Sequence, residues 1–135
     1  MVSLEPMGEA VRRRVVIVDD SRTQCEVWKR LLQARYGERA AVEIYTDPRE
    51  AVRVFGPDIH LMLLDWEMPQ MDGQVVLEHA RAAGVNLKRI IVTSSHPANE
   101  LHEVFDGTGI LAVIEKSEPE QQAAFMLILD SIMKR

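Results

Sequence analysis

The fold is decided by the stretch Ile59-His60-Leu61-Met62-Leu63-Leu64-Asp65-Trp66-Glu67-Met68-Pro69-Gln70-Met71-Asp72-Gly73. It begins as a mainly apolar run, and a run of this length that ends at turn-forming residues is typical of a buried strand. The lone carboxylate of Asp65 therefore lies at the carboxyl end of that strand, where open α/β sheets keep their ligand sites. A carboxylate in that place is either a metal ligand or a nucleophile.

The rest of the chain repeats this alternation of apolar runs and amphipathic stretches. The expected strands are Val15–Val18, Val42–Tyr45, Ile59–Leu64, Arg89–Val92 and Ile110–Ile114. The expected helices are Ser21–Tyr36, one that begins at Asp47 and ends at Gly56-Pro57, Gly73–Ala83, Pro97–Phe105 and Glu118–Met133. Strict alternation predicts a parallel sheet with helices on both faces, which is a single doubly wound α/β domain. Residues 1–11 show no periodicity, so we expect a flexible leader there and the domain over 12–135.

Composition argues against several classes of function. The chain has 135 residues, 47% of them hydrophobic and 27% charged, as in ordinary globular proteins. A net charge of −5 argues against direct binding of nucleic acid, which needs a basic face. Cys25 is the only cysteine, so no internal disulfide can form, and Val15–Val18 is too short for a signal peptide or a membrane span. We therefore expect a cytoplasmic protein without a membrane partner.

Polar residues follow four of the expected strands. They are Asp19-Asp20, Asp65, Thr93-Ser94 and Glu115-Lys116. Because the carboxyl ends of parallel strands share one edge of the sheet, these residues should converge in a shallow cleft. Clustered carboxylates repel one another, and a hard cation such as Mg²⁺ removes this difficulty. The set suits phosphoryl transfer, in which Asp65 would attack while Asp19 and Asp20 hold the metal. Thr93 would contact a phosphoryl oxygen, and Lys116 would pair with its charge.

Taken together, these residues resemble the response-regulator receiver domains of two-component signalling, of the chemotaxis-regulator kind. The matching features, in order, are Asp19-Asp20-Ser21, the run from Asp65 to Gly73 with its Met-Pro-x-Met-Asp-Gly tail, Thr93-Ser94 and Lys116. Each motif alone is common, but their order and separation are specific, and the resemblance extends from about Arg13 to the C-terminus. It implies a flavodoxin-like (βα)5 receiver domain with the strand order 2-1-3-4-5.

The resemblance also implies a role for each matching residue. Asp65 would accept a phosphoryl group from a sensor histidine kinase or a phosphotransfer protein. Asp20, Asp65 and the backbone carbonyl of Glu67 would bind Mg²⁺, and Asp19 would help through water. Thr93 and Lys116 would sense and stabilise the phosphoryl group. The domain would then be a signalling switch that assists its own phosphorylation and dephosphorylation, not an enzyme, and it would pass the signal to a downstream effector.

Two residues depart from the family pattern. Many receivers have an aromatic residue three positions before the lysine, and Val113 stands there without a ring to expose or hide. Glu67 places an acidic side chain at the cleft rim, and we expect it to alter the lifetime of the phosphoryl group. Trp66 either shields one side of the cleft or packs on the surface. The histidines show no metal-ligand spacing and are treated as ordinary residues; they are His60, His79, His96 and His102.

Three other functions are weighed against the receiver. An aspartate-nucleophile phosphatase of the haloacid dehalogenase kind needs a second aspartate where Glu67 stands, and the chain has no room for a cap domain. A flavodoxin-like FMN module would place Asp19-Asp20 against the ligand's phosphate. A degenerate receiver that only scaffolds is disfavoured, because every residue needed for phosphorylation is present. Whether the domain stands alone, belongs to a longer regulator or forms a homodimer stays open.

Overall fold

The computed structural model describes residues 12–96, 105, 107–116 and 119–134. In chain order its strands are β1 Arg13–Val18, β2 Ala40–Tyr45, β3 Ile59–Asp65, β4 Ile90–Ser94 and β5 Ala112–Glu115. Its α-helices are α2 Arg22–Tyr36, α3 Pro48–Ala51, α4 Gly73–Ala82 and α6 Pro119–Met133. Short 3-10 turns cover Gly37–Arg39, Val52–Val54 and Leu87–Arg89. None of the helices in these ranges is long and apolar enough to cross a membrane.

The five strands form one parallel sheet in the order β2-β1-β3-β4-β5, which confirms the predicted topology. Strand β2 lies on one side of β1, and β3, β4 and β5 follow in order on the other side. The order therefore reverses at β1, and β1 and β3 lie side by side with their carboxyl ends together. This reversal is where doubly wound sheets bind their ligands.

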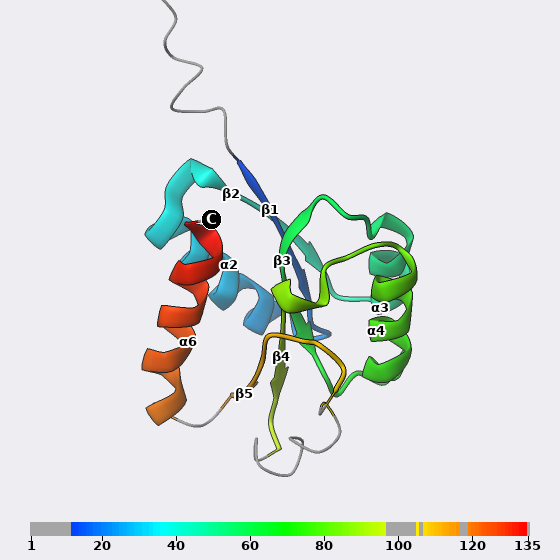
Figure 1. Ribbon diagram of the computed structural model, residues 1–135. Coiled ribbons are helices and arrows are strands. Elements are labelled where there is room, and N and C mark those ends of the chain that lie inside the picture. Colours follow the sequence, from blue (N-terminus) through cyan, green and yellow to red (C-terminus); the bar gives the residue numbers. More distant parts are fainter. Residues whose placement is uncertain (1–11, 97–104, 106, 117–118, 135) are drawn as a thin grey trace, which may run out of the picture.

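Helices cover both faces of the sheet, with α2 and α6 on one side and α3 and α4 on the other (Figure 1). The two apolar layers account for this arrangement. Alternate residues of β1 point to opposite faces, so Val15 and Ile17 join Leu32 of α2 and Leu129 of α6, all fully buried. Val16 and Val18 face the layer formed with α3 and α4, where Val76 is also fully buried.

Side-chain caps begin the helices where the sequence predicts. The Ser21 hydroxyl accepts a hydrogen bond from the Gln24 amide at 3.2 Å and begins α2. The carboxylates of Asp47 and Asp72 cap α3 and α4 in the same way, accepting from the amides two residues further on at 2.9 and 3.0 Å. Asp72 is therefore a helix-capping residue, as expected from its place before Gly73.

Several predicted boundaries were wrong, and β1 and β2 each begin two residues earlier than expected, at Arg13 and Ala40. The helix that begins at Asp47 has only one α turn and continues as the 3-10 turn Val52–Val54, because β-branched residues disfavour the helix and Pro57 prevents its extension. Strand β4 begins one residue late, since Leu87–Arg89 forms a 3-10 turn, and it includes Ser94. Strand β5 begins at Ala112 rather than at Ile110, three residues after a turn in which Gly109 has a φ of 90°. The expected leader over 1–11 and the expected helix Pro97–Phe105, Phe105 excepted, lie outside the described residues.

Candidate phosphorylation and metal site

Three carboxylates meet at the carboxyl ends of β1 and β3. Asp65 is the last residue of β3, and Asp19 and Asp20 follow β1 directly. One oxygen from each lies within 4.8 Å of the others. Asp19 and Asp65 are 1% and 3% exposed, whereas Asp20 is open to solvent. Three carboxylate oxygens at this spacing, two buried and one accessible, are a donor set that suits a hard divalent cation such as Mg²⁺.

Lys116 brings one positive charge to the two buried carboxylates. Its Nζ lies 3.2 Å from Asp19 Oδ2 and 3.2 Å from Asp65 Oδ1. The residue follows β5, and its backbone amide donates a 2.7 Å hydrogen bond to the Ser94 carbonyl, which fixes where the side chain starts. The lysine therefore reaches across the end of β4 to the acidic group, as the convergence of strand ends predicts.

One ammonium does not balance this much negative charge. Burial, and then the neighbouring charge of Asp19, raise the pKa of Asp65 to about 7, although Lys116 acts to lower it. Burial lowers the pKa of Lys116, but Asp19 and Asp65 outweigh it, and the net result is a raised pKa. The lysine therefore stays charged, while the ionised Asp65 carboxylate lies in a site that favours further positive charge.

Backbone groups orient both buried carboxylates. The Glu67 amide donates to Asp65 Oδ1 at 3.2 Å, and the Ser21 amide donates to Asp19 Oδ1 at 2.9 Å. Fixed carboxylate oxygens next to a cation site and an ammonium form a group that can accept a phosphoryl group with little rearrangement.

Thr93 lies beside the nucleophile candidate through strand pairing. It is 1% exposed and is the register partner of Asp65 in the β3–β4 ladder. Its carbonyl accepts a 2.9 Å hydrogen bond from the amide of Trp66, the residue after Asp65. The structure thus brings Asp19, Asp20, Asp65 and Lys116 together, with Thr93 next to Asp65 in the sheet.

The side chain of Glu67 is held by the loop that follows β4. Its carboxylate accepts hydrogen bonds from the Ser94 hydroxyl, from the amide and hydroxyl of Ser95 at 3.1 Å each, and lies 3.1 Å from His96 Nδ1. Although burial acts to raise the pKa of Glu67, these hydrogen bonds lower it below its ordinary value. The sequence alone does not indicate this contact between Glu67 and His96. This contact could have been inferred from the pairing of β3 with β4, because the segments that follow two neighbouring parallel strands lie close together.

Residues 15–127 match the family described as the response regulator receiver domain. The chain belongs to this family. A receiver is a signalling domain and not a classical enzyme, so the phosphatase and flavin-binding alternatives are set aside. Its partners in general are a phosphodonor and a downstream effector.

Several known proteins are similar to this receiver. A putative transcriptional regulator of Haloferax volcanii is 26% identical over 123 residues, which cover 91% of this chain and 21% of that protein. The chain thus spans about a fifth of that relative's length. The non-phosphorylated receiver domain of HemR from Leptospira biflexa has a TM-score of 0.73 at 20% identity, covering 92% of this chain and 96% of that one. The response regulator TrrA of Thermotoga maritima, in complex with Mg²⁺ and BeF, has a TM-score of 0.66 at 21% identity, covering 89% and 98%.

Proposed function

We propose that Asp65 is the phosphoacceptor of this receiver and that a sensor histidine kinase or a phosphotransfer protein is the donor. The single observation that carries the proposal is the contact at 3.2 Å between Lys116 Nζ and the buried carboxylate of Asp65, which belongs to a group of three carboxylates. A carboxylate oxygen of Asp65 attacks the phosphorus, and the bond from phosphorus to the donor's imidazole nitrogen breaks. The histidine leaves with the electron pair, and an acyl phosphate forms on Asp65.

The residues that would hold Mg²⁺ are Asp20, Asp65 and the backbone carbonyl of Glu67, with Asp19 acting through water. Two observations support this set. The carboxylate oxygens lie within 4.8 Å of one another, and the raised pKa of Asp65, caused by burial and by Asp19, marks a site short of positive charge. When bound, the cation supplies neutralisation of the phosphoryl oxygens.

Thr93 and Lys116 would stabilise the phosphoryl group once it is attached. The ammonium of Lys116 is already placed between the two buried carboxylates, so it can pair with the new charge without crossing the site. Thr93, in register with Asp65, would donate its hydroxyl to a phosphoryl oxygen. These groups would favour both the formation and the hydrolysis of the acyl phosphate, so the domain would assist its own modification and its reversal.

The remaining parts of the proposal concern context. The receiver unit would cover residues 12–135, and its phosphorylation would change a surface that a downstream effector reads. The buried free thiol of Cys25 suits a reducing compartment, so we place the domain in the cytoplasm.

Beryllofluoride, which mimics a phosphoryl group, tests this function. Mg²⁺ with beryllofluoride should raise the thermal midpoint of the wild-type protein, because a ligand that binds only the folded state stabilises it. Asp65→Asn and Asp20→Asn should lose most of this rise. Glu50→Gln is the matched control, since Glu50 is an exposed carboxylate in α3, and it should behave as wild type. A wild-type protein that folds but shows no rise would overturn the proposal.

A further inference from the structure

The backbone of Trp66 is connected to two residues of the site, Asp65 and Thr93. It follows Asp65 directly in the chain, and its amide donates a 2.9 Å hydrogen bond to the carbonyl of Thr93. Asp65 and Thr93 are themselves in register across β3 and β4. A displacement at either strand end therefore acts on the backbone of Trp66.

The half-buried ring of Trp66 has two close neighbours. One is Gly73 at the start of α4, where an added Cβ would lie 2.4 Å from Trp66 Cε3. The other is Phe105, whose ring centroid lies 4.4 Å from that of Trp66 at an interplanar angle of 69°. Closely packed groups transmit displacement because few voids lie between them. A movement of the Trp66 ring is therefore passed to Phe105.

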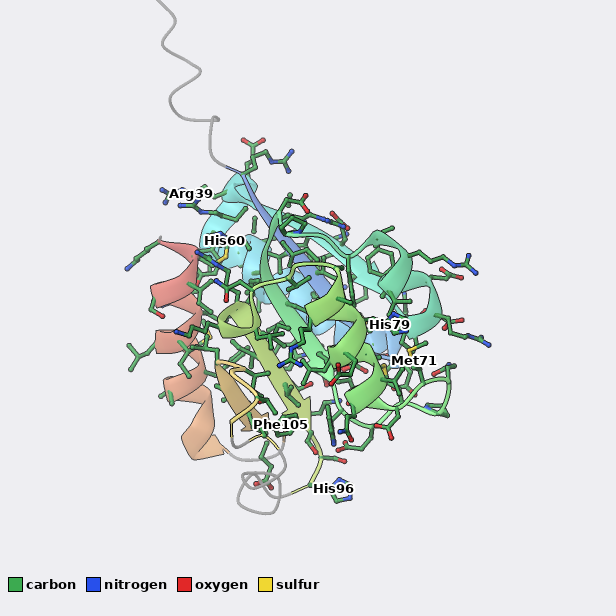
Figure 2. All side chains as sticks on the ribbon, turned by 45° about the vertical axis from the view of Figure 1, so that its right-hand side comes forward. Arg39, His60, Met71, His79, His96 and Phe105 are labelled. Carbon is green, nitrogen blue, oxygen red and sulfur yellow. The ribbon has the colours of Figure 1, made fainter. Side chains whose placement is uncertain are left out.

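Phe105 begins the segment that leads to β5. It is 7% exposed, and its carbonyl accepts hydrogen bonds from the amide of Thr108 at 3.0 Å and from the hydroxyl of Thr108 at 2.7 Å. The turn that follows continues to β5, where Val113 packs in the same apolar layer as Trp66 and Phe105. Figure 2 shows Phe105 at the same end of the molecule as His96, away from Arg39 and His60.

We infer that the Trp66–Phe105 ring pair transmits the conformational change caused by phosphorylation of Asp65 to the segment 107–113. The pair would take the place of the switching aromatic residue that many receivers have where Val113 stands. This inference rests on the proposed function, because it needs a phosphoryl group at Asp65. Its mechanism is a two-part path. The strand ends displace the Trp66 backbone, and the Trp66 ring displaces Phe105 and the turn attached to it.

The chain offers a matched control on the opposite face of the sheet. Trp28 of α2 packs against Phe125 of α6, with ring centroids 5.2 Å apart at an interplanar angle of 56°. This second pair belongs to the other apolar layer, on the opposite face of the sheet from Trp66 and Phe105. Its loss removes a comparable contact without touching the path.

Backbone amide NMR of the full chain tests the inference. Mg²⁺ and beryllofluoride are added to wild type, Trp66→Leu, Phe105→Leu and Trp28→Leu, and the amide shifts of residues 107–113 are followed. All four proteins should bind the mimic, as read from the amides around Asp65. The shifts at 107–113 should persist in wild type and Trp28→Leu and should largely vanish in Trp66→Leu and Phe105→Leu.

Each other outcome is decisive. Full shifts at 107–113 in a variant that lacks either ring of the Trp66–Phe105 pair would overturn the inference and leave the proposed function intact. Failure of the wild type to bind the mimic would overturn the proposed function, and the inference with it. If Trp66→Leu does not fold, Phe105→Leu breaks the same contact from the other side with an apolar side chain and decides the matter alone.

Discussion

The negative charge of Asp65 is held at a cost in stability, and removing it should stabilise the metal-free protein at neutral pH. A carboxyl group whose pKa is higher in the folded than in the unfolded state binds protons more tightly when folded. Stability is therefore lost as the pH rises from the unfolded value toward the folded one. Burial, followed by the charge of Asp19, raises the pKa of Asp65 to about 7 from its ordinary 3.8. Asn at this position keeps the shape and removes the titration.

The size of the effect follows from the two pKa values. At about 1.4 kcal/mol for each pKa unit, the interval from 3.8 to about 7 corresponds to about 4 kcal/mol. This figure is an upper limit, because side chains relax and water enters when a buried group ionises. The free energy of unfolding of Asp65→Asn, minus that of wild type, should therefore grow between pH 4 and pH 7 and then stay constant.

Urea unfolding in the presence of a chelator, at pH 5 and pH 8, measures this difference. We expect Asp65→Asn to exceed wild type at pH 8 by clearly more than at pH 5. Histidine titration cancels, since both proteins carry the same histidines. Saturating Mg²⁺ at pH 8 should raise the wild-type midpoint more than that of the variant. A difference that is equal at the two pH values, or a variant less stable than wild type at pH 8, would refute the reasoning.

Three further predictions test other contacts. Gly73→Ala should lower the free energy of unfolding in urea by about 1–3 kcal/mol, because the new Cβ would clash with Trp66 at 2.4 Å; an unchanged midpoint would show that the ring yields freely. Burial and a hydrogen bond to Asp130 raise the pKa of the Tyr36 phenol, so Asp130→Asn should let Tyr36 ionise at lower pH in an ultraviolet titration, and an unshifted curve would count against this. Glu67→Asn shortens the side chain that holds the loop after β4, so the decay rate of the phosphorylated protein should change several-fold; equal decay would contradict a role for Glu67.

The sequence predicts which site residues lie at the ends of strands, because this depends only on the local pattern of apolar and polar residues. Asp65 ends an apolar run, and Asp19 follows another, so parallel alternation alone brings both to one edge of the sheet. That β1 and β3 are neighbours does not follow from alternation. The family resemblance predicts that β1 and β3 are neighbours, and the pairing of the two strands confirms this prediction.

The contacts around the site could not be predicted in the same way. The partners of Glu67 depend on the path of the loop after β4, which residue patterning does not determine. The packing of Trp66 depends on Phe105, which lies far away in sequence and reaches the ring only through the fold. The predicted length of α3 was wrong for a different reason. Capping residues mark where a helix begins, but they do not determine how far it continues through β-branched residues.

The most direct test of the account is the site of phosphorylation itself. The protein is incubated with acetyl phosphate and Mg²⁺, and its peptides are analysed by mass spectrometry. We predict one phosphoryl group per chain, on the peptide that contains Asp65, with none on Asp65→Asn or when the metal is chelated. An unmodified wild-type protein with intact folding, or a phosphoryl group that persists in Asp65→Asn, would contradict the account.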